Sequence, residues 1–184
     1  MPFIKTEFEG LIIFEPQVWE DDRGYFYESY NERVFGEAGI NSHFVQDNQA
    51  KSTFGVVRGL HYQLPPYAQA KLVRVISGEV LDVVVDIRPD SATYGQSYSL
   101  VLSAENKKQL FIPRGFAHGY AVLTPTAEFA YKCDNFYSKA HEAGISFKDP
   151  KLAIKLPFSW REAVFSEKDL ILPAFGEHKK YFAR

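Results

Sequence analysis

Short runs of apolar residues recur along the chain, and Gly, Pro, Asn or Asp residues separate them. In the run 79–87, the apolar residues at odd positions point to one face, while Asp82 and Asp86 point to the other. A period of two residues is typical of a β-strand. Further strands are expected at 10–16, 24–30, 43–48, 71–77, 98–103, 109–113 and 128–133. Many short strands at regular spacing predict a sandwich or a closed barrel.

Helical signals are few. The segment 31–39 starts with the capping residue Asn31 and ends at Gly39, which predicts a short helix. A second short helix is expected at 159–164. The sequence Ser77-Gly78-Glu79 predicts a turn between two strands that pair with each other.

Composition supports an all-β fold in one domain. The chain has 184 residues, of which 46% are hydrophobic and 16% aromatic, and aromatic residues favour strands. The net charge of −2 gives no reason to expect a nucleic-acid partner. Cys133 is the one cysteine, so we expect no intramolecular disulfide and a cytoplasmic location. Charged residues interrupt the N-terminal stretch and no apolar run could span a bilayer, so neither a signal peptide nor a membrane partner is expected.

Two histidines lie in apolar, strand-like surroundings, His61 in VVRGLHYQ and His118 in IPRGFAHGY. A single such histidine is most often a core residue with its hydrogen bonds satisfied. Because burying an imidazole is costly, two of them, each close to an arginine and a glycine, favour a functional site.

The spacing Pro-x-Gly-x-x-His over 113–118 resembles the second motif of the cupins. Many cupins bind a metal through a His-x-His in their first motif, but the corresponding segment here reads His61-Tyr62-Gln63. Glutamine is a poor ligand for a transition metal compared with imidazole. We therefore expect a site without a metal.

Arg58 stands inside an apolar strand, and a buried arginine needs an anionic partner such as a carboxylate or a phosphate. Strict alternation would place Arg58 and His61 on opposite faces of that strand. A β-bulge at Gly59 would bring both side chains to one face. The other candidate cations are Arg23, Lys71, Arg74 and Lys168, of which Arg74 is expected to be a solvated surface charge.

The whole chain, from about Ile4 to Pro173, resembles the dTDP-4-dehydrorhamnose 3,5-epimerases. The resemblance is carried by DDRGYFYESYNE (21–32), FVQDN (44–48), RGLHYQ (58–63), KLVRVISGEVLDVVVDIR (71–88), LSAENKKQL (102–110), IPRGFAHGY (112–120), EFAYK (128–132) and SEKD (166–169). It implies a cupin-type jelly-roll β-barrel, with a core over about 10–150 of a single domain 1–184. The segment 151–184 would pack on the barrel and carry Asp169. The resemblance also implies a homodimer that exchanges N-terminal strands.

The implied activity inverts C3 and C5 of dTDP-4-dehydro-6-deoxy-D-glucose, giving dTDP-4-dehydro-L-rhamnose, with no cofactor and no metal. In this resemblance, His61 is the general base, Asp169 its dyad partner and Tyr131 the proton donor. Lys71 is our candidate for stabilising the enolate oxygen, with His118 as helper, and Asp82 could orient either. We expect a nearby cation to lower the pKa of Tyr131. The implied substrate contacts are Arg23, Glu28, Gln46, Asn48, Arg58, Lys71, His118, Glu142 and Lys168, with Trp19 and Tyr137 as candidates for stacking on the thymine.

Three alternatives stay open at this point. The first is an epimerase that inverts only C3 or only C5 of a related nucleotide 4-keto sugar. The second is a metal-dependent cupin enzyme, and the third is a sugar-binding cupin without catalysis.

Overall fold

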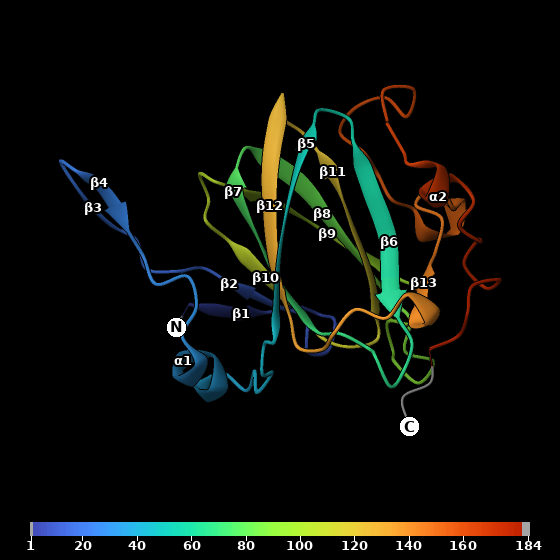
Figure 1. The fold of residues 1–184 in the computed structure, drawn as a ribbon, viewed down its shortest axis with the longest axis horizontal. Coiled ribbons are helices and arrows are strands. Elements are labelled where there is room, and N and C mark those ends of the chain that lie inside the picture. Colours follow the sequence, from blue (N-terminus) through green and yellow to red (C-terminus); the bar gives the residue numbers. More distant parts are fainter. Residues whose placement is uncertain (1, 182–184) are drawn as a thin grey trace.

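The computed structural model describes residues 2–181, and antiparallel strands make up most of its regular structure (Figure 1). One sheet has six strands in the order β1 (Phe3–Lys5), β2 (Ile12–Phe14), β10 (Gln109–Ile112), β7 (Lys71–Ser77), β12 (Thr126–Cys133) and β5 (Gln46–Thr53). The other has five, in the order β13 (Glu142–Gly144), β6 (Val57–Gln63), β11 (Phe116–Val122), β8 (Glu79–Asp86) and β9 (Ser97–Ser103). The two sheets lie face to face in a jelly-roll arrangement, and the prediction of an all-β fold is confirmed.

Strand β8 shows how the sequence pattern becomes packing. Val80 and Val84 belong to the apolar core between the sheets, together with Leu110 and Phe129 of the six-stranded sheet. The apolar residues at odd positions of β8 face outward, but they are also buried, because Ile154 and other residues of the C-terminal segment cover them. The predicted alternation is therefore correct, although both faces of the strand are buried.

The turn at Gly78 connects the two sheets. β7 pairs with β10 and β12, whereas β8 pairs with β11 and β9, so the prediction that the flanking strands pair with each other is wrong. A local turn signal does not specify whether the chain stays in one sheet. Gly78 has φ +77°, and a Cβ at this position would lie 2.2 Å from the backbone oxygen of Thr126.

The helices are short, as expected. α1 (Glu32–Glu37) begins after Asn31, whose side chain accepts hydrogen bonds from two backbone N–H groups. The predicted helix at 159–164 is wrong, because this segment forms turns. Its last residue, Val164, donates a hydrogen bond from its backbone N–H to the backbone oxygen of Gly55. The remaining helices are α2 (Glu167–Leu170) and two 3₁₀ turns, Lys139–His141 and Pro150–Leu152. Within the described residues, no helix is long and apolar enough to cross a membrane.

A two-stranded hairpin, β3 (Trp19–Asp21) and β4 (Gly24–Phe26), extends away from both sheets (Figure 1). We call it the β3–β4 arm. Trp19 and Phe26 on the arm are 54% and 69% exposed, and their rings lie 6.0 Å apart. Large exposed aromatic side chains on an extended hairpin are typical of a surface that contacts another molecule.

Candidate active site

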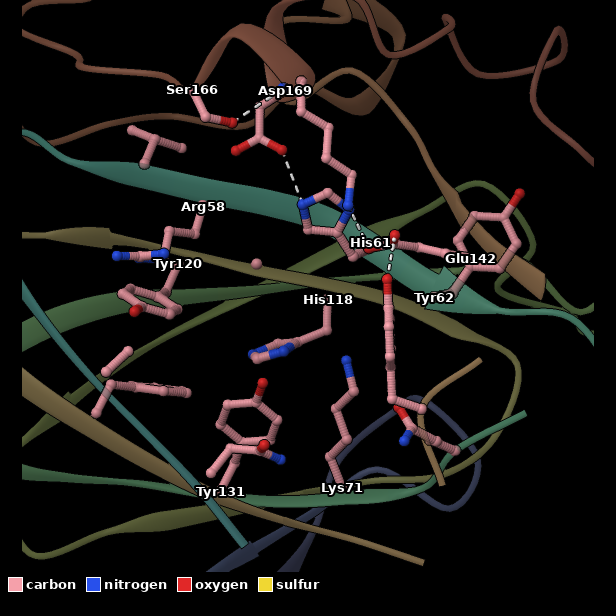
Figure 2. Close-up of a pocket in the computed structure, with 18 of the residues that line it drawn as sticks. Arg58, His61, Tyr62, Lys71, His118, Tyr120, Tyr131, Glu142, Ser166 and Asp169 are labelled. Carbon is pink, nitrogen blue, oxygen red and sulfur yellow. Dashed lines mark hydrogen bonds and ion pairs between the residues drawn. The ribbon is translucent and has the colours of Figure 1, made fainter. Parts of the chain in front are cut away.

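A cavity of about 730 Å³ lies between the two sheets. His61 and Asp169 lie on one side of it, and Tyr131 and Lys71 lie on the other, with His118 between them (Figure 2). The cavity takes side chains from both sheets and from α2.

A bulge in β6 brings Arg58 and His61 to the same cavity. His118 of β11 pairs with His61 and Tyr120 pairs with Arg58, so three steps along β6 oppose two along β11. Gly59 takes φ +106° within this bulge. The hypothesis of a bulge at Gly59 is therefore confirmed. The expectation that Arg58 is buried is wrong: its side chain is exposed, and its Nε donates to Ser52 Oγ at 3.1 Å.

His61 and Asp169 form an imidazole–carboxylate pair. His61 Nε2 lies 2.8 Å from Asp169 Oδ1, and His61 Nδ1 has no hydrogen-bond partner among residues 2–181. Ser166 caps α2 by accepting a bond from the Asp169 N–H at 3.1 Å, which holds the carboxylate above β6. Burial alone would raise the pKa of Asp169, but the hydrogen bond and charge of His61, together with hydrogen bonds from Ser166 and the Gly59 backbone, outweigh burial, and the pKa is lowered.

The opposite wall carries Lys71, Tyr131 and Cys133. β12 pairs with β7, so that Cys133 lies opposite Lys71, and Lys71 Nζ is 5.9 Å from the centre of the Tyr131 ring. Burial lowers the pKa of Lys71. Burial also raises the pKa of Tyr131 to about 12, although Arg58 acts in the other direction. The expectation of a lowered Tyr131 pKa is therefore wrong, because removal from water outweighs the nearby cation.

His118 forms a second imidazole–carboxylate pair. Its Nε2 lies 2.9 Å from Asp82 Oδ2, and both side chains are buried. Of the two residues that Asp82 was expected to orient, Lys71 and His118, it is His118 that it contacts. The His118 ring stacks near Phe129, with ring centres 6.0 Å apart.

Polar groups at one end of the cavity bond to one another. Glu142 accepts from Tyr137 OH at 2.9 Å and from Lys168 Nζ at 2.5 Å. Burial by itself would raise the pKa of Glu142, but these two hydrogen bonds and the Lys168 charge lower it. Gln46 donates to Asn48 Oδ1 at 2.9 Å, and its own oxygen accepts from the Tyr137 N–H at 3.3 Å. These five residues all line the cavity.

Three predicted contact residues lie outside the cavity within a single chain: Trp19, Arg23 and Glu28. Arg23 is 89% exposed and pairs with Asp21 of its own arm. Glu28 accepts a bond from the Asn31 side chain at 3.0 Å. Eleven other predicted site residues, from Gln46 to Asp169, line the cavity.

The sequence reasoning missed several lining residues, among them Tyr120, Phe129 and Cys133. The signal for three of them was present in the period of two: Tyr120 follows His118 by two residues, and Phe129 and Cys133 flank Tyr131 at the same spacing. Tyr120 stacks on Phe129 with ring centres 4.2 Å apart, which closes the apolar side of the cavity.

Within residues 2–181, no group of three or more His, Cys, Asp or Glu side chains could hold a metal ion. His61 and His118 each face their own aspartate instead of converging on one point.

An imidazole–carboxylate pair facing a phenol and a lysine across a jelly-roll cavity defines an acid–base enzyme of the cupin type. The family model for dTDP-4-dehydrorhamnose 3,5-epimerase matches residues 5–177, and the chain belongs to this family of isomerases. A curated dTDP-4-dehydrorhamnose 3,5-epimerase of Shigella flexneri is 56% identical over 92% of this chain and 93% of its own length.

Solved structures agree with the family. The dTDP-4-dehydrorhamnose 3,5-epimerase of Elizabethkingia anophelis is 52% identical, with a TM-score of 0.93 over 97% of this chain and 98% of that one. The dTDP-6-deoxy-D-glucose-3,5-epimerase of Legionella pneumophila, solved with dTDP-4-keto-L-rhamnose, is 44% identical. It has a TM-score of 0.92 over 98% of both chains.

Proposed function

We propose that this chain inverts C3 and C5 of dTDP-4-dehydro-6-deoxy-D-glucose and so makes dTDP-4-dehydro-L-rhamnose for dTDP-L-rhamnose biosynthesis. The observation that carries the proposal is the placement of His61 and Tyr131 on opposite sides of one cavity. The ketone at C4 acidifies the protons on C3 and C5, because the electrons left behind form an enolate. Inversion requires a base on one face of the ring and an acid on the other.

His61 acts as the base in this proposal. The Asp169 carboxylate beside Nε2 favours the tautomer with hydrogen on that nitrogen, which leaves the lone pair on Nδ1. When the imidazole takes a proton from carbon, the carboxylate stabilises the imidazolium that forms. The C–H electron pair moves into the enolate, whose negative charge collects on the C4 oxygen.

Tyr131 supplies the proton on the other face. Its raised pKa, about 12, keeps the phenol protonated at neutral pH, as a proton donor must be. The enolate collapses as the carbon takes the phenol proton, and the products are a ketone of inverted configuration, a phenolate and an imidazolium. Exchange of protons with water restores both side chains, after which the second carbon reacts in the same way.

Lys71 stabilises the charge on the enolate oxygen, with His118 as a second donor. Donors fixed in a cavity of low dielectric often provide the largest contribution to catalysis. Arg58 and Lys168 supply positive charge for the diphosphate at separate places along the cavity. Gln46, Asn48 and Glu142 supply hydrogen bonds, and Tyr137, which is 54% exposed, can stack on the thymine.

The assembly in this proposal is a homodimer with exchanged N-terminal segments. Trp19, Arg23 and Glu28 lie outside the cavity of their own chain, while the β3–β4 arm extends away from the sheets (Figure 1). An arm that reaches a second chain would bring these residues to the partner's cavity, where Arg23 could bind phosphate. We further propose a cytoplasmic location, which suits the buried free thiol of Cys133.

Proton NMR of the reaction in D₂O tests the function. Incubation of the 4-keto sugar nucleotide should place deuterium at both C3 and C5. Deuterium at one carbon alone would favour a single-site epimerase, and an absence of turnover with intact dTDP-sugar binding would favour a sugar-binding protein. Loss of activity with a chelator, restored by a stoichiometric metal, would favour a metal-dependent cupin enzyme.

A further inference from the structure

Gln63 stands where a metal-binding cupin has the second histidine of its first motif, and the proton transfers described above give it no role. Its side chain lies at the end of β6, lines the cavity and is only 6% exposed. A buried amide must have hydrogen-bond partners, and the partners of Gln63 indicate what it does.

The Gln63 amide connects two loops at one end of the cavity. Its Nε2 donates to the backbone oxygen of Tyr67 at 2.7 Å and to that of Phe136 at 3.1 Å. Its Oε1 accepts a hydrogen bond from the backbone N–H of Ser138 at 2.6 Å. Tyr67 lies between β6 and β7, whereas Phe136 and Ser138 lie between β12 and β13, in the segment 134–141 that we call the 134–141 loop.

A side-chain amide matches all three partners of Gln63. Both of its N–H groups donate to carbonyl oxygens, and its oxygen accepts from an N–H group. A carboxylate of the same shape has no N–H to donate, and it would place an oxygen against two carbonyl oxygens. A histidine with hydrogen on both ring nitrogens could donate twice but would have no acceptor left. The residue type at this position therefore suits the two loops.

The 134–141 loop carries the aromatic side chain that the proposed function assigns to the thymine. Tyr137 lies between Phe136 and Ser138, the two residues of this loop that Gln63 contacts. Its OH donates to Glu142, and Glu142 is the cross-strand partner of Gln63, because β13 pairs with β6. Since the Tyr137 side chain is exposed, its position depends on the hydrogen bonds that fix the loop backbone.

Two other glutamines contact this loop. Gln46 accepts a hydrogen bond from the Tyr137 N–H at 3.3 Å, and Gln69 Nε2 donates to the backbone oxygen of Asn135 at 2.7 Å. Each of them makes one hydrogen bond to the loop, and both are more exposed than Gln63. Gln63 bonds to the loop on both sides of Tyr137 and is therefore its main anchor.

We propose that Gln63 is a positioning residue whose amide holds the 134–141 loop against β6 and so fixes Tyr137 where it can stack on the thymine. The inference rests on the proposed function for the ligand that Tyr137 contacts. It predicts that changes at Gln63 weaken binding of the nucleoside part of the substrate. Proton transfer by His61 and Tyr131 should continue once the substrate is bound.

Gln63→Glu tests the proposal, because pH switches the introduced carboxyl between two states. The protonated carboxyl can still accept from the Ser138 N–H and can donate one hydrogen bond to a loop carbonyl. The ionised carboxylate donates none and repels both carbonyl oxygens. Because burial raises the pKa of a carboxyl, we expect the change of state between about pH 5 and about pH 8.

Calorimetry with dTDP across this pH range gives the readout. The affinity of Gln63→Glu should be within about twofold of wild type at about pH 5 and about tenfold weaker at about pH 8, which corresponds to the loss of one or two hydrogen bonds. KM for the 4-keto sugar nucleotide should rise by the same factor, with kcat nearly unchanged. Comparison with wild type at each pH cancels the titration of dTDP and of the nearby Tyr67, His141 and Glu142.

Asn106→Asp is the matched control. Asn106 also bonds to three backbone groups: it accepts from the N–H groups of Ser103 and Lys108. It donates to the backbone oxygen of Val101. Because it lies between β9 and β10, outside the cavity, this variant should bind dTDP with wild-type affinity at every pH. Pyrophosphate, which lacks the thymine, should bind Gln63→Glu as it binds wild type.

Wild-type dTDP affinity in Gln63→Glu at about pH 8 would overturn the proposal. Equal losses for dTDP and pyrophosphate would also overturn it, because they would show that Gln63 merely supports the cavity as a whole. If Gln63→Glu does not fold, Gln63→Met keeps the length of the side chain without a charge. It should bind dTDP about tenfold more weakly at every pH, and unchanged affinity would contradict the proposal. A wild-type protein that does not bind dTDP would instead contradict the proposed function.

Discussion

Replacing Gly59 with alanine tests the link between the bulge in β6 and the site. Gly59 has φ +106°, and a Cβ here would lie 2.6 Å from the backbone oxygen of His118 and 2.7 Å from Cα of Gly119. Both contacts are with backbone, so no side chain can rotate away to relieve them. The added methyl group must push β6 and β11 apart at the point where His61 and His118 pair.

The expected loss of stability has two parts. A left-handed backbone conformation costs an alanine about 1–2 kcal/mol, and overpacking of a tight site costs about 1–3 kcal/mol. The sum is about 2–5 kcal/mol, and each kcal/mol lowers the melting temperature of a chain of this size by about 2–4 °C. Because the same strain moves His61 relative to the opposite wall, turnover of the folded protein should also fall, by about tenfold to a hundredfold.

Gly39→Ala provides the matched control. Gly39 has φ +86° with no atom within 4 Å of the added Cβ, so only the backbone cost of about 1–2 kcal/mol applies. Both variants are measured by thermal unfolding at one protein concentration and by turnover at a temperature where each is folded. If Gly59→Ala has the same melting temperature as Gly39→Ala and retains wild-type turnover, this prediction is refuted.

Three further predictions concern single side chains. Tyr131→Phe should lower turnover by about 10²–10⁴-fold with dTDP affinity unchanged in calorimetry; near-normal turnover would exclude Tyr131 as the donor. Lys71→Met should lower kcat by about 10²–10³-fold, and a smaller change in steady-state assays would argue against its role at the enolate. Burial lowers the pKa of His178 from 6.5, so its contribution to stability is full above that pH and is lost as the pH falls below it. Melting temperatures should therefore drop between pH 7 and 5 less steeply in His178→Gln, and equal slopes would contradict this.

The sequence predicted the strands best where a run of seven or eight mostly apolar residues is available, as in β7 and β8. β1, β3 and β13 were missed as separate strands, because each has three residues, which is too few for a period to be read. Local sequence patterns could not predict which strands pair with each other, as the turn at Gly78 shows. That turn joins two sheets, although its residues suit a hairpin equally well.

The site was predictable in part. The bulge at Gly59 followed from the need to bring Arg58 and His61 to one face, and the structure has it. The contact of Asp169 with His61 could not be read from composition or spacing, because it depends on how the C-terminal segment returns to β6; only the family resemblance indicated it. The direction of the Tyr131 pKa shift was missed because sequence shows which cations are near along the chain but not how completely a phenol is withdrawn from water.

The most direct test of the account is solvent-proton exchange into the 4-keto sugar nucleotide by His61→Asn, an isosteric change that removes the base and leaves the cavity its shape. If one imidazole acts as the base for both carbons, deuterium from D₂O should enter neither C3 nor C5 in this variant, while dTDP should still bind with wild-type affinity. Deuterium entering either carbon at more than about a hundredth of the wild-type rate would contradict it.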